Sequence, residues 1–146
     1  MTSGAEHSHT PALHVGGVWL VGDAIVLVRR DRPVSRWTTP GGTVRAGETL
    51  AEAVVRCVAD DAGVEALCGP FLGWGEVVDS GDHVVTMYFE VVVLDRPEID
   101  PHTGSMPPGR ATTEVRCTPD WEVSELPVVA GLAEFLADLG LIELVV

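Results

Sequence analysis

The sequence contains no lysine, so all nine basic residues are arginines, and 22 acidic residues bring the formal net charge to −13 at pH 7. This excess of negative charge repels polyanions, which argues against polymeric nucleic acid and against an anionic membrane as partners. The chain also lacks an apolar run long enough to span a bilayer, and its N-terminus lacks the basic start and long apolar stretch of a signal peptide. We therefore expect a cytoplasmic protein that does not bind membranes.

Cysteine is scarce as well. Cys57, Cys68 and Cys117 form no C-x-x-C pair, and their odd number argues against a disulfide framework. We expect reduced, mostly buried thiols and no zinc site. The chain of 146 residues is long enough for one domain with a sizeable core, and no internal repeat is visible. We divide it into a flexible N-terminal tail, residues 1–13, and a single domain, residues 14–146.

A glycine-rich turn followed by a capped helix dominates residues 41–64. Thr49 and Glu52 have the T-x-x-E spacing of a capping box, which predicts that the helix begins near Leu50. Gly63 stands where a left-handed C-terminal cap would end it. At about 100° per residue, one broad apolar face is formed by Leu50, Ala51, Val54, Val58 and Ala62.

Two adjacent acids lie at the edge of that face. Asp61 projects close to it and Asp60 lies further round, with Cys57 between them. A carboxylate at the rim of a buried face loses hydration, and it needs a cation or hydrogen-bond donors to stay ionised. One interpretation is a site for Mg²⁺ or Mn²⁺ with oxygen ligands. The other is that these acids form the solvated side of the helix.

Arginines gather just upstream of this helix. Five of the nine are Arg29, Arg30, Arg32, Arg36 and Arg45. Guanidinium groups bind phosphate oxygens bidentately, so arginines beside a metal site suit a small phosphorylated ligand. The alternative is that some of them only balance nearby acids. Trp37 can be a packing residue under the glycine turn or, alternatively, a platform on which a base stacks.

The same segment resembles the Nudix box, G-x5-E-x7-R-E-U-x-E-E-x-G-U, in which U is a bulky aliphatic residue. The positions that match without gaps are Gly42, Glu48, Arg56, Val58, Gly63 and Val64. Residues 37–41, W-T-T-P-G, also resemble the usual approach to the box. The departures are Cys57, which replaces the glutamate after the arginine, and Asp60 and Asp61, which replace the paired glutamates.

This resemblance implies a hydrolase that cleaves the diphosphate of a nucleoside diphosphate linked to another group, with water attacking phosphorus and divalent metal ions neutralising charge. Asp60 and Asp61 would bind Mg²⁺ or Mn²⁺, whereas a thiol at Cys57 is a poor ligand for these ions. Glu48 would contact the metal-binding residues and not the metal ion itself. Arg56 would pair with the acids of the site and orient them.

Further site residues follow from the same resemblance and from the arginine cluster. Glu114, just before a predicted strand, resembles a late acid that some members use as a ligand or base. The candidate substrate-binding residues are Arg29, Arg36, Arg45, Trp37, Gly41 and Gly42. The expected ligand is a small nucleotide-like diphosphate.

Two functions stay open. The first is a metal-dependent pyrophosphohydrolase with a modified metal site, which the presence of Glu48 and Arg56 favours. The second is a Nudix-fold module that binds a nucleotide without cleaving it, which Cys57 favours. The apolar C-terminus, residues 141–146, is expected to dock on the domain or on a second subunit, so a homodimer is one expected assembly.

The remaining elements predict an α/β fold with three layers around a central mixed sheet. The Nudix-like α/β/α sandwich that the resemblance implies has the same arrangement. A hairpin is expected from residues 15–21 and 24–29, and further strands from residues 71–78, 83–94 and 114–117. A turn is expected at Gly69-Pro70. The strand at 83–94 is nearly continuous in apolar residues, so we expect it to be covered on both faces. Residues 95–110 are expected to form a loop, and a last helix should begin at Ser124 or Pro127 and run through Leu139.

Overall fold

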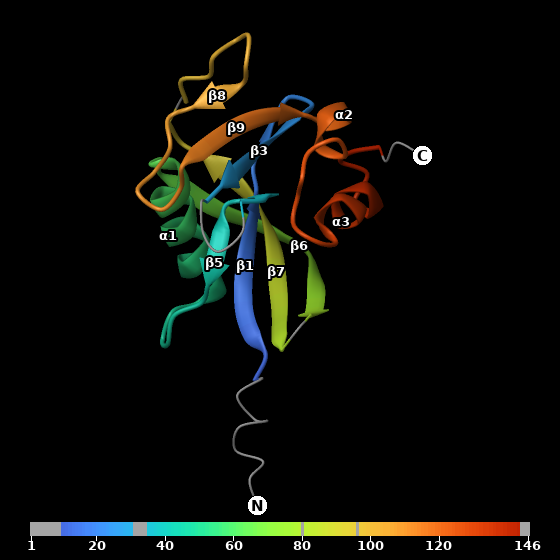
Figure 1. Ribbon diagram of the computed structural model, residues 1–146. Helices are drawn as coiled ribbons and strands as arrows, with labels where there is room; N and C mark the ends of the chain where they lie inside the picture. Colours follow the sequence, from blue (N-terminus) through green and yellow to red (C-terminus); the bar gives the residue numbers. More distant parts are fainter. Residues whose placement is uncertain (1–9, 31–34, 80, 96, 144–146) are drawn as a thin grey trace, which may run out of the picture.

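The computed structural model describes residues 10–30, 35–79, 81–95 and 97–143 (Figure 1). The predicted tail therefore lies mostly outside the described residues, and the first strand begins at Ala12, two residues before the predicted domain start. Arg32 of the arginine cluster also lies outside them. Within the described residues, no helix is long and apolar enough to cross a membrane.

The first sheet is mixed and carries the glycine-rich turn. It has the order β5 (Gly41–Thr43), β1 (Ala12–Val18), β7 (Asp82–Val93) and β6 (Ala66–Asp79). β1 and β7 are parallel, whereas β5 and β6 pair antiparallel with their neighbours. A Cβ atom on Gly41 would lie 2.1 Å from the Val15 carbonyl oxygen, so only glycine allows β5 to lie this close to β1.

The second sheet is antiparallel. β3 (Ala24–Arg29) lies between β2 (Leu20–Val21) and β9 (Glu114–Pro119), and β9 also pairs with β8 (Ser105–Met106). The short strand β4 (Trp37–Thr38) pairs with the end of β3. The predicted strand at 114–117 is confirmed. The described residues of the 95–110 loop, 95 and 97–110, form no helix and no strand apart from β8.

The predicted hairpin is only partly correct, because its first strand is divided between the two sheets. Residues 12–18 pair with β7 and β5, and the chain leaves that sheet at the buried Trp19. Only Leu20 and Val21 then pair with β3, across a turn in which Gly22 has a φ of 60°. One valine-rich run thus contributes a strand to each sheet. The hydrophobic pattern alone does not show where the chain passes from one sheet to the other.

Helix α1 (Leu50–Ala62) begins and ends where the sequence predicts. The Thr49 hydroxyl accepts from the Glu52 amide at 3.1 Å, and the Glu52 carboxylate accepts from the Thr49 amide at 2.9 Å. Gly63 ends the helix with a φ of 66°. The buried apolar residues of α1, among them Val54 and Val58, pack with residues of β1 and β7 in one core cluster.

The predicted turn at Gly69-Pro70 is wrong, because β6 continues through it. The register of β6 against β7 shifts between Cys68 and Phe71 and again before Gly73, so bulges absorb the proline. β6 is an edge strand, where a missing amide donor is tolerated. The expectation that β7 is covered on both faces is met only in part. Val91 packs in the core cluster that contains α1, and Tyr88, on the opposite face, packs in the cluster that contains Leu132 and Leu136. The other residues of the strand are half-buried or exposed.

The last helix begins later than predicted. The chain forms the short helix α2 (Asp120–Val123) and then α3 (Leu132–Asp138), so neither Ser124 nor Pro127 begins the last helix. The intervening segment is held beside Trp37, whose amide donates to the Pro127 carbonyl and whose carbonyl accepts from the Val129 amide, both at 2.9 Å. This tertiary pairing keeps residues 127–129 extended.

Helices α1 and α3 lie on opposite sides of the strands (Figure 1). α3 packs in a second core cluster with α2 and β3, and the buried Ile142 joins that cluster, so the described part of the apolar C-terminus docks on the domain. The predicted α/β fold with a central mixed sheet is confirmed. The glycine turn of β5, which pairs with the middle of β1, meets the C-terminal end of α1, and the candidate site lies there.

Candidate functional site

The buried carboxylate of Asp61 is held by a guanidinium and by the glycine turn. Asp61 is 1% exposed. Its Oδ1 atom accepts from Arg30 Nη2 at 2.6 Å, and its Oδ2 atom accepts from the Gly41 amide at 2.8 Å. Arg30 Nη2 also donates to the Gly41 carbonyl at 3.0 Å. Burial raises the pKa of Asp61, and the neighbouring Arg30 opposes that rise.

The adjacent Asp60 is paired with two other arginines. Arg110 donates from Nε to Asp60 Oδ1 at 2.9 Å, and its Nη2 lies 2.7 Å from the same oxygen. Arg56 Nη1 lies 3.8 Å from Asp60 Oδ2. The Arg110 side chain is 78% exposed, so this contact lies at the surface and can open without disturbing the core.

The loop before β9 docks on the C-terminal end of α1. The amides of Gly109 and Ala111 donate to the carbonyls of Asp61 and Asp60, each at 2.9 Å, and the Thr112 hydroxyl donates to the Asp61 carbonyl at 2.6 Å. These bonds satisfy carbonyl groups that the helix end would otherwise leave unpaired. A Cβ atom on Gly109 would lie 2.3 Å from the Asp60 carbonyl oxygen, so this contact needs glycine.

Glu48 and Arg56 form a bidentate ion pair. Arg56 donates from Nε to Glu48 Oε2 at 2.7 Å and from Nη2 to Oε1 at 2.9 Å. The hydrogen bonds from Arg56 and from the Arg45 amide lower the pKa of Glu48 to about 2. Arg56 also donates to the Thr43 carbonyl at 2.8 Å, so this pair fastens α1 to β5.

Three further candidates, Arg29, Glu114 and Trp37, meet at the end of the second sheet. Arg29 forms an ion pair with Glu114, and its guanidinium carbon lies 4.9 Å from the centre of the Trp37 ring. Trp37 is 5% exposed and belongs to the second core cluster. Its position fits the packing interpretation, because little of the ring is open to a base.

Cys57 is buried beside the glycine turn. Burial raises the pKa of its thiol, which therefore stays protonated at neutral pH. A Cβ atom on Gly42 would lie 3.4 Å from Cys57 Sγ, so the helix and the turn are in close contact here. A protonated thiol packed against a glycine is not a ligand for a hard cation.

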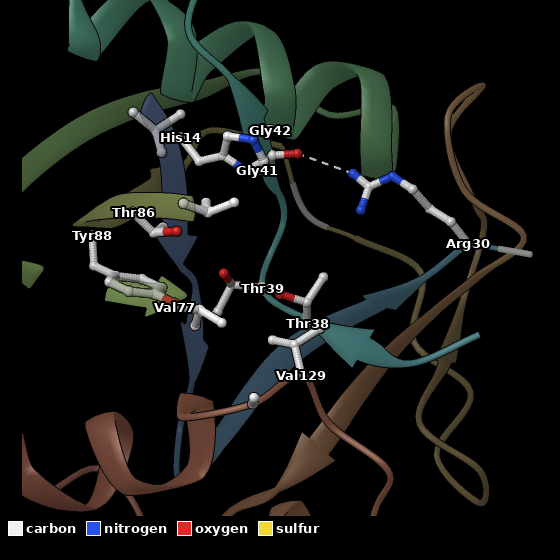
Figure 2. Close-up of a pocket in the computed structure, with 13 residues that line it drawn as sticks. His14, Arg30, Thr38, Thr39, Gly41, Gly42, Val77, Thr86, Tyr88 and Val129 are labelled. Atoms are coloured by element: carbon white, nitrogen blue, oxygen red, sulfur yellow. Dashed lines mark hydrogen bonds between the residues drawn. The ribbon is translucent and has the colours of Figure 1, made fainter. Parts of the chain in front are cut away.

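A cavity of about 420 Å³ opens next to the Arg30–Asp61 pair (Figure 2). One part of the cavity is lined by Arg30, Thr38, Thr39, Gly41 and Gly42. Much of the remaining lining is apolar and consists of Val15, Val77, Val84, Tyr88, Val129 and Ala130. A guanidinium at one end of a mostly apolar pocket is suited to a small ligand with an anionic group at one end.

His14 also lines this cavity, although nothing in the sequence marked it as a site residue. Its Nε2 atom lies 3.3 Å from the Thr43 hydroxyl, with which it is paired across β1 and β5. Burial and the nearby Arg30 lower the pKa of His14, so the imidazole is neutral at pH 7. A lone histidine in a valine-rich strand is a weak signal, and only the pairing with β5 places it at the site.

Not all predicted substrate-binding residues come together. Gly41 and Gly42 line the cavity, as does Arg30 of the arginine cluster. Trp37 and Arg29 do not line it, Arg36 is an exposed residue, and Arg45 lies beside Glu48. Binding roles for these four residues stay predictions.

The carboxylates of the helix do not fit a divalent ion as they are arranged. Asp61 already accepts from Arg30 and a backbone amide, and Asp60 already accepts from Arg110. Within the described part of the chain, no group of three or more histidine, cysteine, aspartate and glutamate side chains is placed to hold a metal ion. The cations at these acids are arginines of the protein itself.

Comparisons with known proteins agree with this geometry at the level of the fold. The NUDIX domain profile matches residues 10–139. The MutT protein from Methanosarcina mazei Go1 is 19% identical, covers 89% of this chain and 93% of its own, and superposes with a TM-score of 0.74. A MutT Nudix hydrolase from Burkholderia pseudomallei is 18% identical over 88% and 97% of the two chains, with a TM-score of 0.69.

A third structure, an ADP-ribose pyrophosphatase from Streptococcus suis 89-1591, is 20% identical over 90% of each chain, with a TM-score of 0.62. No curated protein matches the chain in sequence. At these identities the structures establish the fold, whereas the domain profile covers most of the chain. The protein therefore belongs to the Nudix domain family.

Proposed function

We propose that this protein is a Nudix-type hydrolase that binds a nucleoside diphosphate derivative in the cavity beside Arg30 and cleaves its diphosphate bond. Family membership supports the reaction class, since pyrophosphatases that act on diphosphates are found among proteins of this fold. The observation that carries the proposal is the cavity itself, in which Arg30 and the Gly41–Gly42 turn adjoin an apolar pocket.

The two ends of the cavity suit the two ends of such a ligand. The nucleoside part would lie among Val77, Val84, Tyr88 and Val129, and the diphosphate would lie at the Arg30 end. A guanidinium there stabilises the negative charge that develops when water attacks phosphorus. The neutral His14 in the same cavity can accept a hydrogen bond from that water.

Nudix hydrolases generally use divalent metal ions such as Mg²⁺, which would supply further positive charge at the phosphates. Asp60 and Asp61 as they stand do not fit such an ion, because both already accept from arginines. We therefore assign no step to a metal ion. Metal dependence on Mg²⁺ or Mn²⁺ stays a prediction for the assay below.

The pairing of every candidate acid favours a second function. An ion pair with an arginine is formed by each of the four candidate acids, Glu48, Asp60, Asp61 and Glu114. A protein whose acids are neutralised in this way can hold a nucleotide-like diphosphate without cleaving it. The second candidate is therefore a binding or regulatory module that uses the same cavity and the same class of ligand.

Turnover separates the two functions. ADP-ribose, UDP-glucose and nucleoside triphosphates would be incubated with the protein in Mg²⁺, in Mn²⁺ and in EDTA, and the products would be resolved by chromatography. The hydrolase proposal predicts cleavage within the diphosphate of at least one substrate, with loss of activity in His14→Ala. Binding without turnover in all three conditions would favour the second candidate.

Two further expectations also stay predictions, namely a cytoplasmic location and assembly as a homodimer. Edge strand β6 carries exposed apolar side chains, among them Phe71, Trp74 and Val78, which a second subunit could cover. Light scattering coupled to size-exclusion chromatography measures the mass in solution. A mass of one chain at all concentrations would contradict the dimer.

A further inference from the structure

Arg30 occupies the place where the sequence motif leads one to expect a metal ion. Its Nη2 atom lies 2.6 Å from Asp61 Oδ1 and 3.0 Å from the Gly41 carbonyl oxygen, so one cationic nitrogen joins the helix to the glycine turn. Both acceptors are oxygen atoms of the kind that Mg²⁺ prefers. The guanidinium therefore satisfies the same oxygens that a divalent ion would need.

Arg30 still has donors to offer. Within the described residues only its Nη2 atom makes hydrogen bonds, which leaves the N–H groups of Nε and Nη1 for a ligand. The side chain is 32% exposed and lines the cavity. Figure 2 shows its guanidinium directed from the end of β3 toward Gly41 and the cavity.

The arrangement also fixes the guanidinium before any ligand arrives. Asp61 is buried and held by the Gly41 amide, so its carboxylate is a rigid partner for Arg30. A charged group that is already held in place loses less conformational freedom when it binds a phosphate. By contrast, a divalent ion that approached Asp61 would meet the like charge of Arg30 at the same oxygens.

We propose that Arg30 is the resident cation of this site, and that a diphosphate binds its Nε and Nη1 groups directly, without a divalent ion. This inference rests on the proposed function only for the identity of the ligand, a nucleoside diphosphate derivative. It adds that ligand binding is independent of metal, whatever the metal requirement of any later hydrolysis.

The test is calorimetric titration of the intact protein with ADP and with ADP-ribose, in EDTA and in Mg²⁺. The expected result is an affinity that is the same in both buffers within about twofold, since no ion bridges ligand and protein. Arg30→Ala should weaken binding at least about tenfold, because a charge-assisted contact is lost. Arg30→Lys should recover only part of the loss, because an ammonium lacks the planar fork of donors.

Removing Arg30 alone leaves Asp61 buried without its cation, so that variant can fail to fold. The double variant Arg30→Met with Asp61→Asn removes both charges and keeps an oxygen for the Gly41 amide. It should fold and should show the same loss of binding. Arg116→Ala is the matched control, because Arg116 is also a partly buried, ion-paired arginine but lies outside the cavity. Its affinity should equal that of the wild type.

Four results bear on the proposal. Binding that appears only in Mg²⁺ would overturn it, even if the protein proves to be a hydrolase. Unchanged affinity in the folded double variant would overturn it as well, as would the absence of binding by either probe in both buffers. Binding in EDTA that depends on Arg30 supports it, even if no turnover is found and the hydrolase proposal fails.

Discussion

Arg56 binds Glu48 through two parallel hydrogen bonds, with Nε at 2.7 Å from Oε2 and Nη2 at 2.9 Å from Oε1. The pair joins the loop before α1 to the helix itself, and Arg56 extends the link to the Thr43 carbonyl. These contacts hold the glycine turn at the end of α1 where Asp60 and Asp61 lie. The pair therefore positions the site from a place outside the cavity.

Glu48→Gln should show what this pair contributes and at which pH. The pKa of Glu48 is lowered to about 2 from its ordinary 4.5, so the unfolded chain binds the proton more readily. The stabilisation is then complete above about pH 4.5 and is lost as the pH falls toward 2. We expect a lower melting temperature than the wild type at pH 7, with a difference that shrinks below pH 4.5.

The control for that measurement is Glu125→Gln, which changes an exposed carboxylate distant in sequence from the helix. Its melting curve should follow the wild type across the same range. A difference between Glu48→Gln and the wild type that stays constant from pH 7 to pH 3 would contradict the lowered pKa.

The lowered pKa of His14 should also make the stability of the protein depend on pH, in the range near neutrality. Its pKa lies below the ordinary 6.5 because of burial and Arg30. Below about pH 6.5 the unfolded chain therefore binds more protons at this residue than the folded one, and stability falls as the pH falls. His14→Gln should remove this part of the pH dependence of the melting temperature. If the melting temperatures of the two proteins change in parallel between pH 8 and pH 5, the pKa of His14 is not lowered in the folded state.

The docking of the loop on α1 can be tested at Gly109. Gly109→Ala places a Cβ atom 2.3 Å from the Asp60 carbonyl oxygen, so the loop must move away from the helix end. We expect a loss of about 1–3 kcal/mol in the free energy of unfolding. Gly75→Ala is the control, because its Cβ atom would make only an ordinary contact at 3.6 Å with Tyr88. Equal stability of both variants in urea denaturation would mean that the loop is not held there.

Cys57→Glu restores the glutamate that the motif has at this position. Cys57 is 3% exposed and lies against Gly42, so we expect a buried carboxylate that lacks partners and a loss of about 1–3 kcal/mol in stability. Hydrolysis in Mg²⁺ should not rise. Cys57→Ser keeps the size of the side chain and serves as the control. Higher turnover at an unchanged melting temperature would instead identify a metal enzyme weakened by loss of one ligand.

Local signals in the sequence predicted the parts of the fold that local chemistry determines. Thr49, Glu52 and Gly63 place both ends of α1, because caps depend on residues a few positions apart. The start of α3 at Leu132 escaped prediction, since residues 127–129 are held extended by Trp37, some 90 positions earlier in the chain. Hydrophobic spacing carries no information about such a pairing.

The same limit applies to the candidate site. The motif placed Asp60 and Asp61 together on one helix, and the arginine cluster indicated cations nearby. Which arginine meets which acid depends on how β3, β5 and the loop before β9 converge, and that is a tertiary property. The link between Arg30 and Asp61, 31 positions apart, could therefore not be read from the sequence.

A crystal structure with bound ADP, grown in the presence of Mg²⁺, would show directly which cation holds the diphosphate. We expect ADP in the cavity, with diphosphate oxygens at about 3 Å from Nε or Nη1 of Arg30. Arg30 Nη2 should still lie on Asp61 and on the Gly41 carbonyl. A diphosphate held through a metal ion at Asp60 and Asp61, with Arg30 displaced, would show that Arg30 is not the resident cation, as would ADP bound outside the cavity.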